Sequence, residues 1–172
     1  FADVDVIIYV GGLSPKLEGE EMKVDYKGFR GGDRTSIELP ETQREYIAKL
    51  AGLDKPLVFV NLSGSAVALA PEAENCDAIL QAWYGGQAGG EAVADVLFGD
   101  YNPAGRLPVT FYASDADLPH FNDYNMEGRT YRYFKGQPLF PFGHGLSYTT
   151  FEYGDAQVAD GVITIPVTNA GA

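Results

Sequence analysis

Residues 4–10 read VDVIIYV and run directly into two glycines. A short run of β-branched and aromatic residues that ends at glycines is typical of a buried β-strand closed by a sharp turn. Residues 56–61 (PLVFVN) and residues 78–83 (AILQAW) have the same form, and glycines follow each of them within a few positions. The sequence therefore predicts three core strands.

Two segments carry the signals of helices. Residues 39–52 (LPETQREYIAKLAG) place Ile47 and Leu50 at helical spacing, with acidic residues early, a lysine late and a glycine at the end. Residues 88–99 (AGGEAVADVLFG) gather small and branched apolar residues on one face and also end at glycine. Strands that alternate with helices predict an α/β fold, here a three-layer α/β/α sandwich around a mainly parallel sheet with right-handed crossovers.

The segments that follow the three strands are expected to meet at one edge of the sheet. In open α/β sheets, ligands bind outside the carboxyl ends of the strands. Those ends lead into residues 11–33, 61–65 and 83–90. The first of these is irregular, charged and about twenty residues long, which is more than a simple connection in a compact domain needs. We therefore expect function to reside there.

Composition and charge exclude several classes of function. The 172 residues are 45% hydrophobic and carry a net charge of −12, so the surface repels phosphate backbones and no nucleic-acid partner is expected. Cys76 is the only cysteine, which excludes an internal disulfide and a thiolate metal site. No run of about 18 apolar residues is present, so no membrane partner is expected.

The character of the chain changes after the second predicted helix. From Tyr101 onward proline, glycine and aromatic residues predominate, which indicates short strands and loops. Residues 162–169 (VITIPVTN) alternate apolar and polar side chains as the opening strand of a β-sandwich does. We expect residues 1–153 to form the α/β unit, and residues 154–172 to form a linker and the first strand of a second, truncated domain.

An acidic cluster lies in the long segment after the first strand. Glu18, Glu20 and Glu21 are close in sequence, and neighbouring like charges and partial burial both raise the pKa of a carboxyl group. A raised pKa allows a carboxylic acid to donate a proton near neutral pH. On spacing alone, a solvated surface cluster explains the same three residues.

Other motifs favour structural roles. Residues 85–96 are glycine-rich but lack the order of a dinucleotide or P-loop motif. Residues 61–65 (NLSGS) lack the glycines of a nucleophile elbow, and their N-x-S triplet at a strand end favours a structural or ligand role over a glycan. His120 and His144 have no partner at ligand spacing, so packing or loop hydrogen bonds are expected. The sequence predicts no metal site and no cofactor.

Five blocks of sequence, in order, resemble the C-terminal half of glycoside hydrolase family 3, the β-xylosidase and β-glucosidase family. The resemblance runs from about residue 3 to residue 153, and GDYNPAGRLPVTFY and FPFGHGLSYT are its most specific parts. The blocks are GGLSPKLEGEE, GGDRTSIELPETQ, KPLVFVNLSGSAVAL, CDAILQAWYGGQAGGEAVADVLFGDYNPAGRLPVTFY and FPFGHGLSYTTFEY. The resemblance implies a parallel αβ-sandwich domain followed by a fibronectin type III-like domain, of which VITIPVTNAGA is the first strand.

The resemblance also implies roles for particular residues. In the family an upstream barrel domain supplies an aspartate nucleophile, and the sandwich domain supplies the general acid/base glutamate. The matching position is Glu20, with Glu18 and Glu21 as alternatives. Asp33 and Arg34 match an Asp-Arg pair of the family and are expected to bind substrate or to shape the loop, for example as a local ion pair. Without the barrel, the chain is expected to be inactive alone.

The implied activity is that of a retaining, exo-acting β-glycosidase of plant polysaccharide breakdown. EGRTYRYF (residues 127–134), followed by PLFPFGHGLSYT, resembles the β-xylosidase and α-arabinofuranosidase branch more than the β-glucosidase branch. A β-glucosidase, a carbohydrate-binding module that uses its aromatic loops, and an oligomerisation piece that pairs sheet edges between copies remain alternatives. The expected partners are xylo- or gluco-oligosaccharides and the upstream barrel, and the complete protein is expected to be extracellular or periplasmic.

Overall fold

The computed structural model describes residues 3–19 and 22–171. Its central sheet has the strand order β1 (Ile7–Gly12), β5 (Leu57–Leu62), β6 (Ala78–Gln81), and both pairs are parallel. The other elements, in chain order, are α1 Pro15–Glu18, β2 Asp25–Tyr26, β3 Phe29–Arg30, β4 Asp33–Arg34, α2 Glu41–Ala51, α3 Ala70–Asn75, α4 Gly89–Phe98, a 3-10 turn Asp115–Asp117, α5 Thr130–Tyr133, β7 Phe151–Tyr153, β8 Gln157–Ala159, β9 Val162–Thr164 and β10 Val167–Asn169. The predicted α/β fold with a mainly parallel sheet is confirmed.

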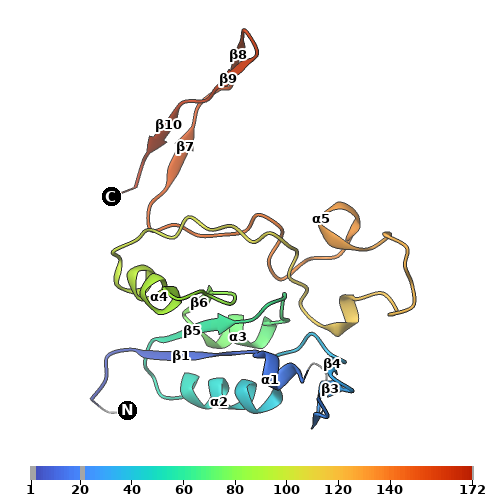
Figure 1. The fold of residues 1–172 in the computed structure, drawn as a ribbon. Helices are drawn as coiled ribbons and strands as arrows, with labels where there is room; N and C mark the ends of the chain where they lie inside the picture. The colour runs from blue at the N-terminus through green and yellow to red at the C-terminus, as the bar shows by residue number, and fades with distance from the viewer. Residues whose placement is uncertain (1–2, 20–21, 172) are drawn as a thin grey trace.

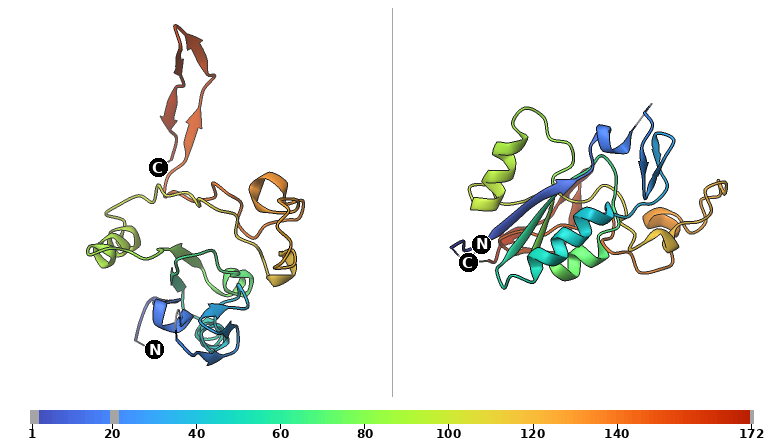
Figure 2. Two further views of the ribbon diagram at one scale, coloured as in Figure 1. Left: turned by 45° about the vertical axis from the view of Figure 1, so that its right-hand side comes forward. Right: turned by 90° about the horizontal axis from the view of Figure 1, so that it is seen from below.

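Helices lie on both sides of the sheet. Figure 2 (left) shows α2 and α3 on one side of the sheet and α4 on the other. The helix α2 forms where the sequence predicted it, because Ile47 and Leu50 share one face and are buried against the strands. The helix α4 ends at Gly99, which adopts the left-handed conformation typical of a helix C-terminus.

The core lies between the sheet and α2. It includes Leu57 and Phe59 of β5 and Ile47 of α2, all essentially inaccessible to solvent. The opposite face of β1 differs from the prediction of a fully buried strand, since Ile8 and Val10 are exposed there while Ile7 is buried. The alternation arises because β1 is an edge strand of the sheet and α4 lies on the side of β6 (Figure 1).

A charged cluster joins α2 to α3. Arg44 Nε donates to Glu72 Oε1 at 2.9 Å, Nη1 contacts Glu38 Oε2 at 2.5 Å, and Nη2 donates to the Ala68 carbonyl at 3.0 Å. The side chain of Glu72 is only 1% exposed. Burial by itself lowers the pKa of Arg44, but the hydrogen bonds to the two carboxylates outweigh it and the pKa is raised. This cluster explains why α3 is stable without an apolar stripe, and why sequence patterning did not predict it.

The end of β1 is held by a glutamine from α2. Gln43 accepts from the Gly12 N–H and donates to the Gly12 carbonyl, both at 2.7 Å. Gly12 has φ +119°, and a Cβ at this position would overlap the Leu62 carbonyl oxygen. Glycine is therefore required at the point where the chain leaves the sheet for the long segment.

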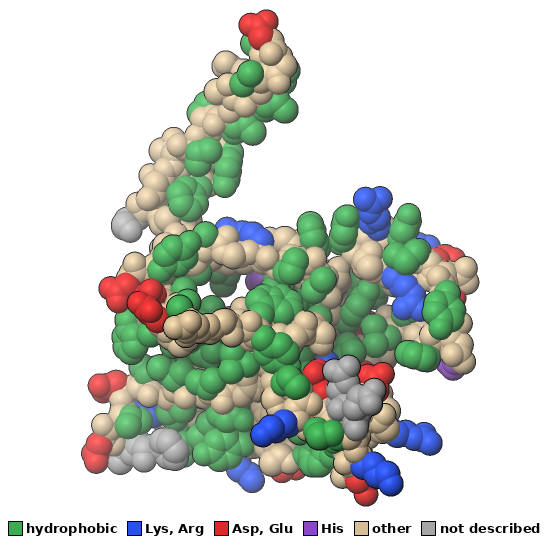
Figure 3. All heavy atoms as spheres, in the orientation of Figure 1, with side chains coloured by type: hydrophobic (Ala, Val, Ile, Leu, Met, Phe, Trp, Pro, Cys, Tyr) green, Lys and Arg blue, Asp and Glu red, His purple; other side chains and the backbone are tan. Residues whose placement is uncertain are grey.

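The C-terminal part projects from the α/β unit as a two-stranded ribbon (Figure 1). The strand β10 pairs antiparallel with β7, and β9 pairs antiparallel with β8. The single strand predicted over residues 162–169 is thus two short strands, because Pro166 lies between them and has no N–H to donate to a ladder. Figure 3 shows hydrophobic side chains along the ribbon. Within residues 3–19 and 22–171, no helix has the length and apolar character that crossing a bilayer requires.

Candidate active site

Segments that follow all three core strands meet at one edge of the sheet, as predicted. The parallel pairing places the carboxyl ends of β1, β5 and β6 side by side. Beyond β5, Ser65 accepts a hydrogen bond of 3.1 Å from Arg34 Nη1. Beyond β6, the ring of Tyr84 packs directly against Gly64, where an added Cβ would lie 2.8 Å from Cε2. Residues 11–19, 34, 64–65 and 84 therefore lie at one edge, which we call the rim.

The acidic segment begins at this rim. Glu18 is the last residue of α1, a short helix that Ser14 caps by accepting from the Leu17 N–H at 3.2 Å. Gly19 follows in the left-handed conformation. The helix starts three residues after β1 ends, so Glu18 stays near the edge of the sheet. Glu20, the predicted acid, and its alternative Glu21 lie outside the described residues.

Glu18 is electrostatically coupled to two other rim residues, Arg34 and Tyr84. Burial raises the pKa of Tyr84, and the negative charge of Glu18 raises it further. The charge of Glu18 also favours the protonated form of Arg34. Both effects require proximity, because interactions between charges at a protein surface fade over about 10 Å. The rim thus combines a carboxylate from α1, a guanidinium from β4 and a phenol from the segment after β6.

Arg34 is placed differently from the predicted ion pair. Among the described residues its guanidinium forms no ion pair with Asp33, whose carboxylate instead accepts from the Arg34 backbone N–H at 2.7 Å. The side chain turns toward Ser65, because the tight β3–β4 turn leaves the backbone N–H of Arg34 as the nearest donor for Asp33. Burial lowers the pKa of Arg34, although nearby acidic groups oppose this effect.

Asp115 ties the rim to a distant part of the chain. Its carboxylate accepts from Ser36 Oγ at 2.7 Å and from the Ile37 N–H at 2.8 Å. Sequence analysis did not single out Asp115, although the capping residues around it were detectable: Ser114 caps the 3-10 turn together with Asp117. The contact holds the segment that leads from β4 to α2, and so limits the freedom of Arg34.

The N-x-S triplet has the structural role that the sequence favoured. Asn61 and Ser63 are fully buried. Asn61 Nδ2 donates to Gln81 Oε1 at 2.6 Å, and Ser63 Oγ donates to the Ser65 carbonyl at 2.9 Å. A buried amide cannot carry a glycan, and a buried serine cannot attack a substrate. Their hydrogen bonds hold the chain in place at the end of β5, next to the rim.

The two histidines also have structural contacts. His120 Nδ1 accepts from the Asn122 N–H at 3.2 Å, and the ring of His144 stacks on Phe140 with 5.0 Å between centroids. Over residues 3–19 and 22–171, no group of three or more His, Cys, Asp and Glu side chains is arranged to hold a metal ion.

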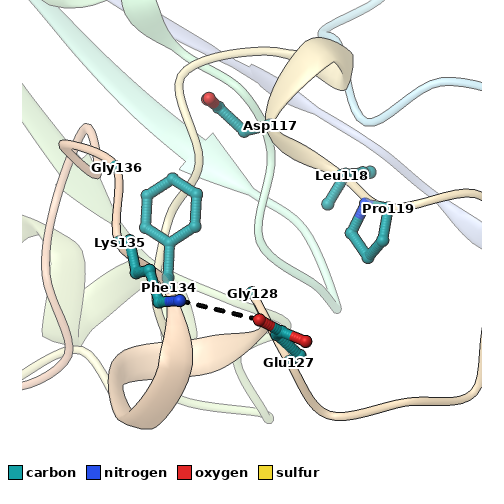
Figure 4. Close-up of a pocket in the computed structure, with 8 residues that line it drawn as sticks. All are labelled: Asp117, Leu118, Pro119, Glu127, Gly128, Phe134, Lys135 and Gly136. Carbon is teal, nitrogen blue, oxygen red and sulfur yellow. Dashed lines mark ion pairs between the residues drawn. The ribbon is translucent and has the colours of Figure 1, made fainter.

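A separate hollow of about 390 Å³ lies in the loop region around α5. Figure 4 shows Phe134 facing it from one side and Leu118 and Pro119 from the other, with the Glu127–Lys135 pair near its opening. The two charged groups are 3.6 Å apart and largely exposed. The hollow shares no lining residue with the rim.

Comparison with known proteins identifies the family to which this α/β sandwich belongs. Residues 1–148 match the family described as Glycosyl hydrolase family 3 C-terminal domain. The chain belongs to this family.

Relatives of known activity carry two kinds of name. The chain is 61% identical to a xylan 1,4-β-xylosidase of Xylanibacter ruminicola over 98% of its own length and 20% of that protein. It is 40% identical to a periplasmic β-glucosidase of Salmonella typhimurium, over 97% of the chain and 23% of the relative. The chain therefore spans about one fifth of the proteins it matches.

Solved structures agree with this assignment. The chain resembles a GH3 exo-β-xylosidase, XlnD, in complex with a xylobiose aziridine probe, with a TM-score of 0.76 and 36% identity over 90% of the chain and 20% of that structure. It resembles a β-glucosidase of Kluyveromyces marxianus in complex with glucose with a TM-score of 0.79 and 34% identity, over 99% of the chain and 21% of that structure.

Proposed function

We propose that this chain is the domain that supplies the general acid/base of a retaining, exo-acting β-glycosidase, and that Glu20 is that group. The observation that carries the proposal is the position of the acidic segment, which starts at the rim beside Arg34, Ser65 and Tyr84. Ligands of α/β sheets bind at such an edge. Glu18 and Glu21 are the alternatives on the same segment.

The proposed mechanism requires a second carboxylate from outside this chain. In a retaining glycosidase the two carboxyl groups stand about 5 to 5.5 Å apart, one attacking the anomeric carbon and the other protonating the departing oxygen. Glu20 gives its proton as the glycosidic bond breaks. As a carboxylate it then removes a proton from the water that hydrolyses the glycosyl-enzyme. An upstream barrel domain supplies the nucleophile, and residues 154–172 form a linker and the start of a fibronectin type III-like domain.

The proposed substrate is a terminal β-D-xylosyl residue of a plant oligosaccharide. Support comes from the 61% identity to a named xylan 1,4-β-xylosidase and from the likeness to an exo-β-xylosidase structure. Two relatives named β-glucosidase are less similar, at 40% and 41% identity. The name of one of them also supports a periplasmic or extracellular location for the complete protein.

Separating the chain from the rest of the enzyme tests whether the acid/base and the nucleophile belong to different domains. We expect the complete protein to hydrolyse an aryl β-xyloside, and the 172-residue chain alone to show no activity above buffer, because one carboxylate cannot carry out both steps. Release of the chromogenic phenol measures the activity of the complete protein and of the chain alone. Hydrolysis by the chain alone would show that it contains its own nucleophile and would overturn the proposal.

Saccharide binding in the hollow around Phe134 is a second candidate function. The hollow combines an aromatic ring, two apolar side chains and an exposed Glu127–Lys135 pair, which together suit the apolar face and the hydroxyl groups of a sugar. It is independent of the barrel nucleophile.

Calorimetry with xylo-oligosaccharides tests this second function. We expect binding to the complete protein, with its nucleophile removed, to weaken about fivefold in Phe134→Ala, which corresponds to the 1 kcal/mol typical of an aromatic contact. Phe121→Ala is the matched control, because that ring is 86% exposed and does not line the hollow. Equal binding by both variants would exclude this site.

A further inference from the structure

Among the described residues, one nitrogen of the Arg34 guanidinium donates a hydrogen bond and the other two do not. Nη1 donates to Ser65 Oγ at 3.1 Å. Nε and Nη2 are buried and have no hydrogen-bond partner among the described residues. A buried donor without a partner costs about 1 to 3 kcal/mol, so two such atoms on one side chain indicate that a functional ligand or a movable group completes the arrangement.

The unpaired atoms form the edge of arginine that best fits a carboxylate. Nε and Nη2 present two parallel N–H groups, which match the two oxygens of a carboxylate. Among the residues that the structure describes, the charged and titratable groups that face Arg34 are Glu18 of α1, Asp33 of β4, Tyr84 beyond β6 and Asp115 of the 3-10 turn.

Two of the carboxylates among these groups already have other partners. Asp33 accepts from a backbone N–H, and Asp115 accepts from Ser36 and Ile37. Glu18 is the facing carboxylate to which the structure assigns no hydrogen bond among the described residues, and it begins the acidic segment.

We propose that Arg34, anchored on Ser65, is a positioning residue for the general acid/base, acting through its attraction for the acidic segment that begins at Glu18. This inference rests on the proposed function. Arg34 touches neither the substrate nor the reacting atoms in this role. Arg34 fixes the position of the acidic segment next to the rim. Its positive charge favours the carboxylate form of groups on that segment.

Substitutions in the complete enzyme separate positioning from a merely structural role. In Arg34→Met, kcat/KM for a substrate with a poor leaving group falls about 10²-fold, as a misplaced catalytic group does. A substrate with an activated leaving group, which needs little proton donation, loses far less. Arg34→Lys keeps the charge but cannot donate two parallel hydrogen bonds. Its kcat/KM for the substrate with a poor leaving group is therefore expected to lie between those of the wild type and Arg34→Met.

The pH profile provides the readout that a structural role does not move. On the basic side, activity is lost as the acid deprotonates. A nearby positive charge lowers the pKa of that acid, so removing it raises the pKa and shifts the basic limb of kcat/KM to higher pH, by about one unit. We expect this shift in Arg34→Met and a smaller one in Arg34→Lys.

Arg30→Met is the matched control. Arg30 belongs to the neighbouring strand β3 and is exposed, so its removal changes the net charge equally but leaves the basic limb in place. The positioning role would be overturned if Arg34→Met kept its thermal midpoint of unfolding, lost kcat/KM equally for both leaving groups and left the basic limb of the pH profile unchanged. If Glu20→Ala, Glu18→Ala and Glu21→Ala all lack a leaving-group dependence, the proposed function fails instead.

Discussion

Replacing Glu20 by alanine in the complete enzyme is expected to lower kcat/KM for an alkyl β-xyloside or xylobiose by about 10³-fold. Proton donation by a positioned side chain contributes roughly 10²- to 10⁴-fold, and a poor leaving group depends fully on it. The phenolate of an aryl xyloside with a strongly acidic phenol departs without that proton. The fall in kcat/KM for such a substrate, which reports the first step, is therefore expected to be small. Steady-state kinetics on the two substrates measure the difference.

The neighbouring glutamates provide the controls for this experiment. Glu21→Ala alters the charge of the segment equally, and we expect it to retain most of the activity on both substrates. If Glu20→Ala affects both leaving groups alike, Glu20 is not the acid. A leaving-group dependence that is larger in Glu18→Ala or Glu21→Ala than in Glu20→Ala would reassign the role to that residue.

Replacing Arg44 by methionine is expected to destabilise the domain by about 3 kcal/mol. The reason is the carboxylate of Glu72, which is 1% exposed and relies on the guanidinium for two hydrogen bonds, of 2.9 and 3.3 Å. Removing one partner of a buried pair leaves an uncompensated charge and costs about 3 to 5 kcal/mol. Arg44 itself is 26% exposed, so water relieves part of the cost and the lower end applies. Chemical denaturation of the protein measures the change.

An exposed pair that also involves α2, through Glu41, is the comparison. Lys27 and Glu41 lie 2.9 Å apart, with side chains 76% and 53% exposed, and exposed pairs contribute about 0 to 1 kcal/mol. We therefore expect Lys27→Met to shift the denaturation midpoint little. Similar losses in Arg44→Met and Lys27→Met would show that water enters the cluster around Glu72 and that burial does not set its contribution.

Short-range patterns in the sequence predicted the elements that depend on a continuous apolar face. The strand β5 and the helix α2 are examples, because Leu57 and Phe59 alternate at strand spacing and Ile47 and Leu50 recur at helical spacing. Parallel pairing followed from their alternation along the chain, and with it the shared edge of the carboxyl ends. Elements without such a face were missed, as α3 and the two-residue strands β2 to β4 show.

Contacts between distant residues could not be predicted in this way. A local ion pair with Asp33 was one of the arrangements open to Arg34 in the sequence, but its guanidinium reaches Ser65, 31 positions away. Asp115 holds Ser36 across 79 positions. A side chain's choice among several nearby partners depends on where the backbone places them, and that placement is a property of the packed structure.

The amino-acid sequence by itself determined the three strands of the central sheet, the two long helices, the common edge and the family, because each depends on local periodicity or on a run of consecutive residues. Only the tertiary structure decided that Glu18, Arg34, Ser65 and Tyr84 meet at that edge. The physical reason is that charge and hydrogen bonding act over a few ångströms in space, whatever the separation along the chain.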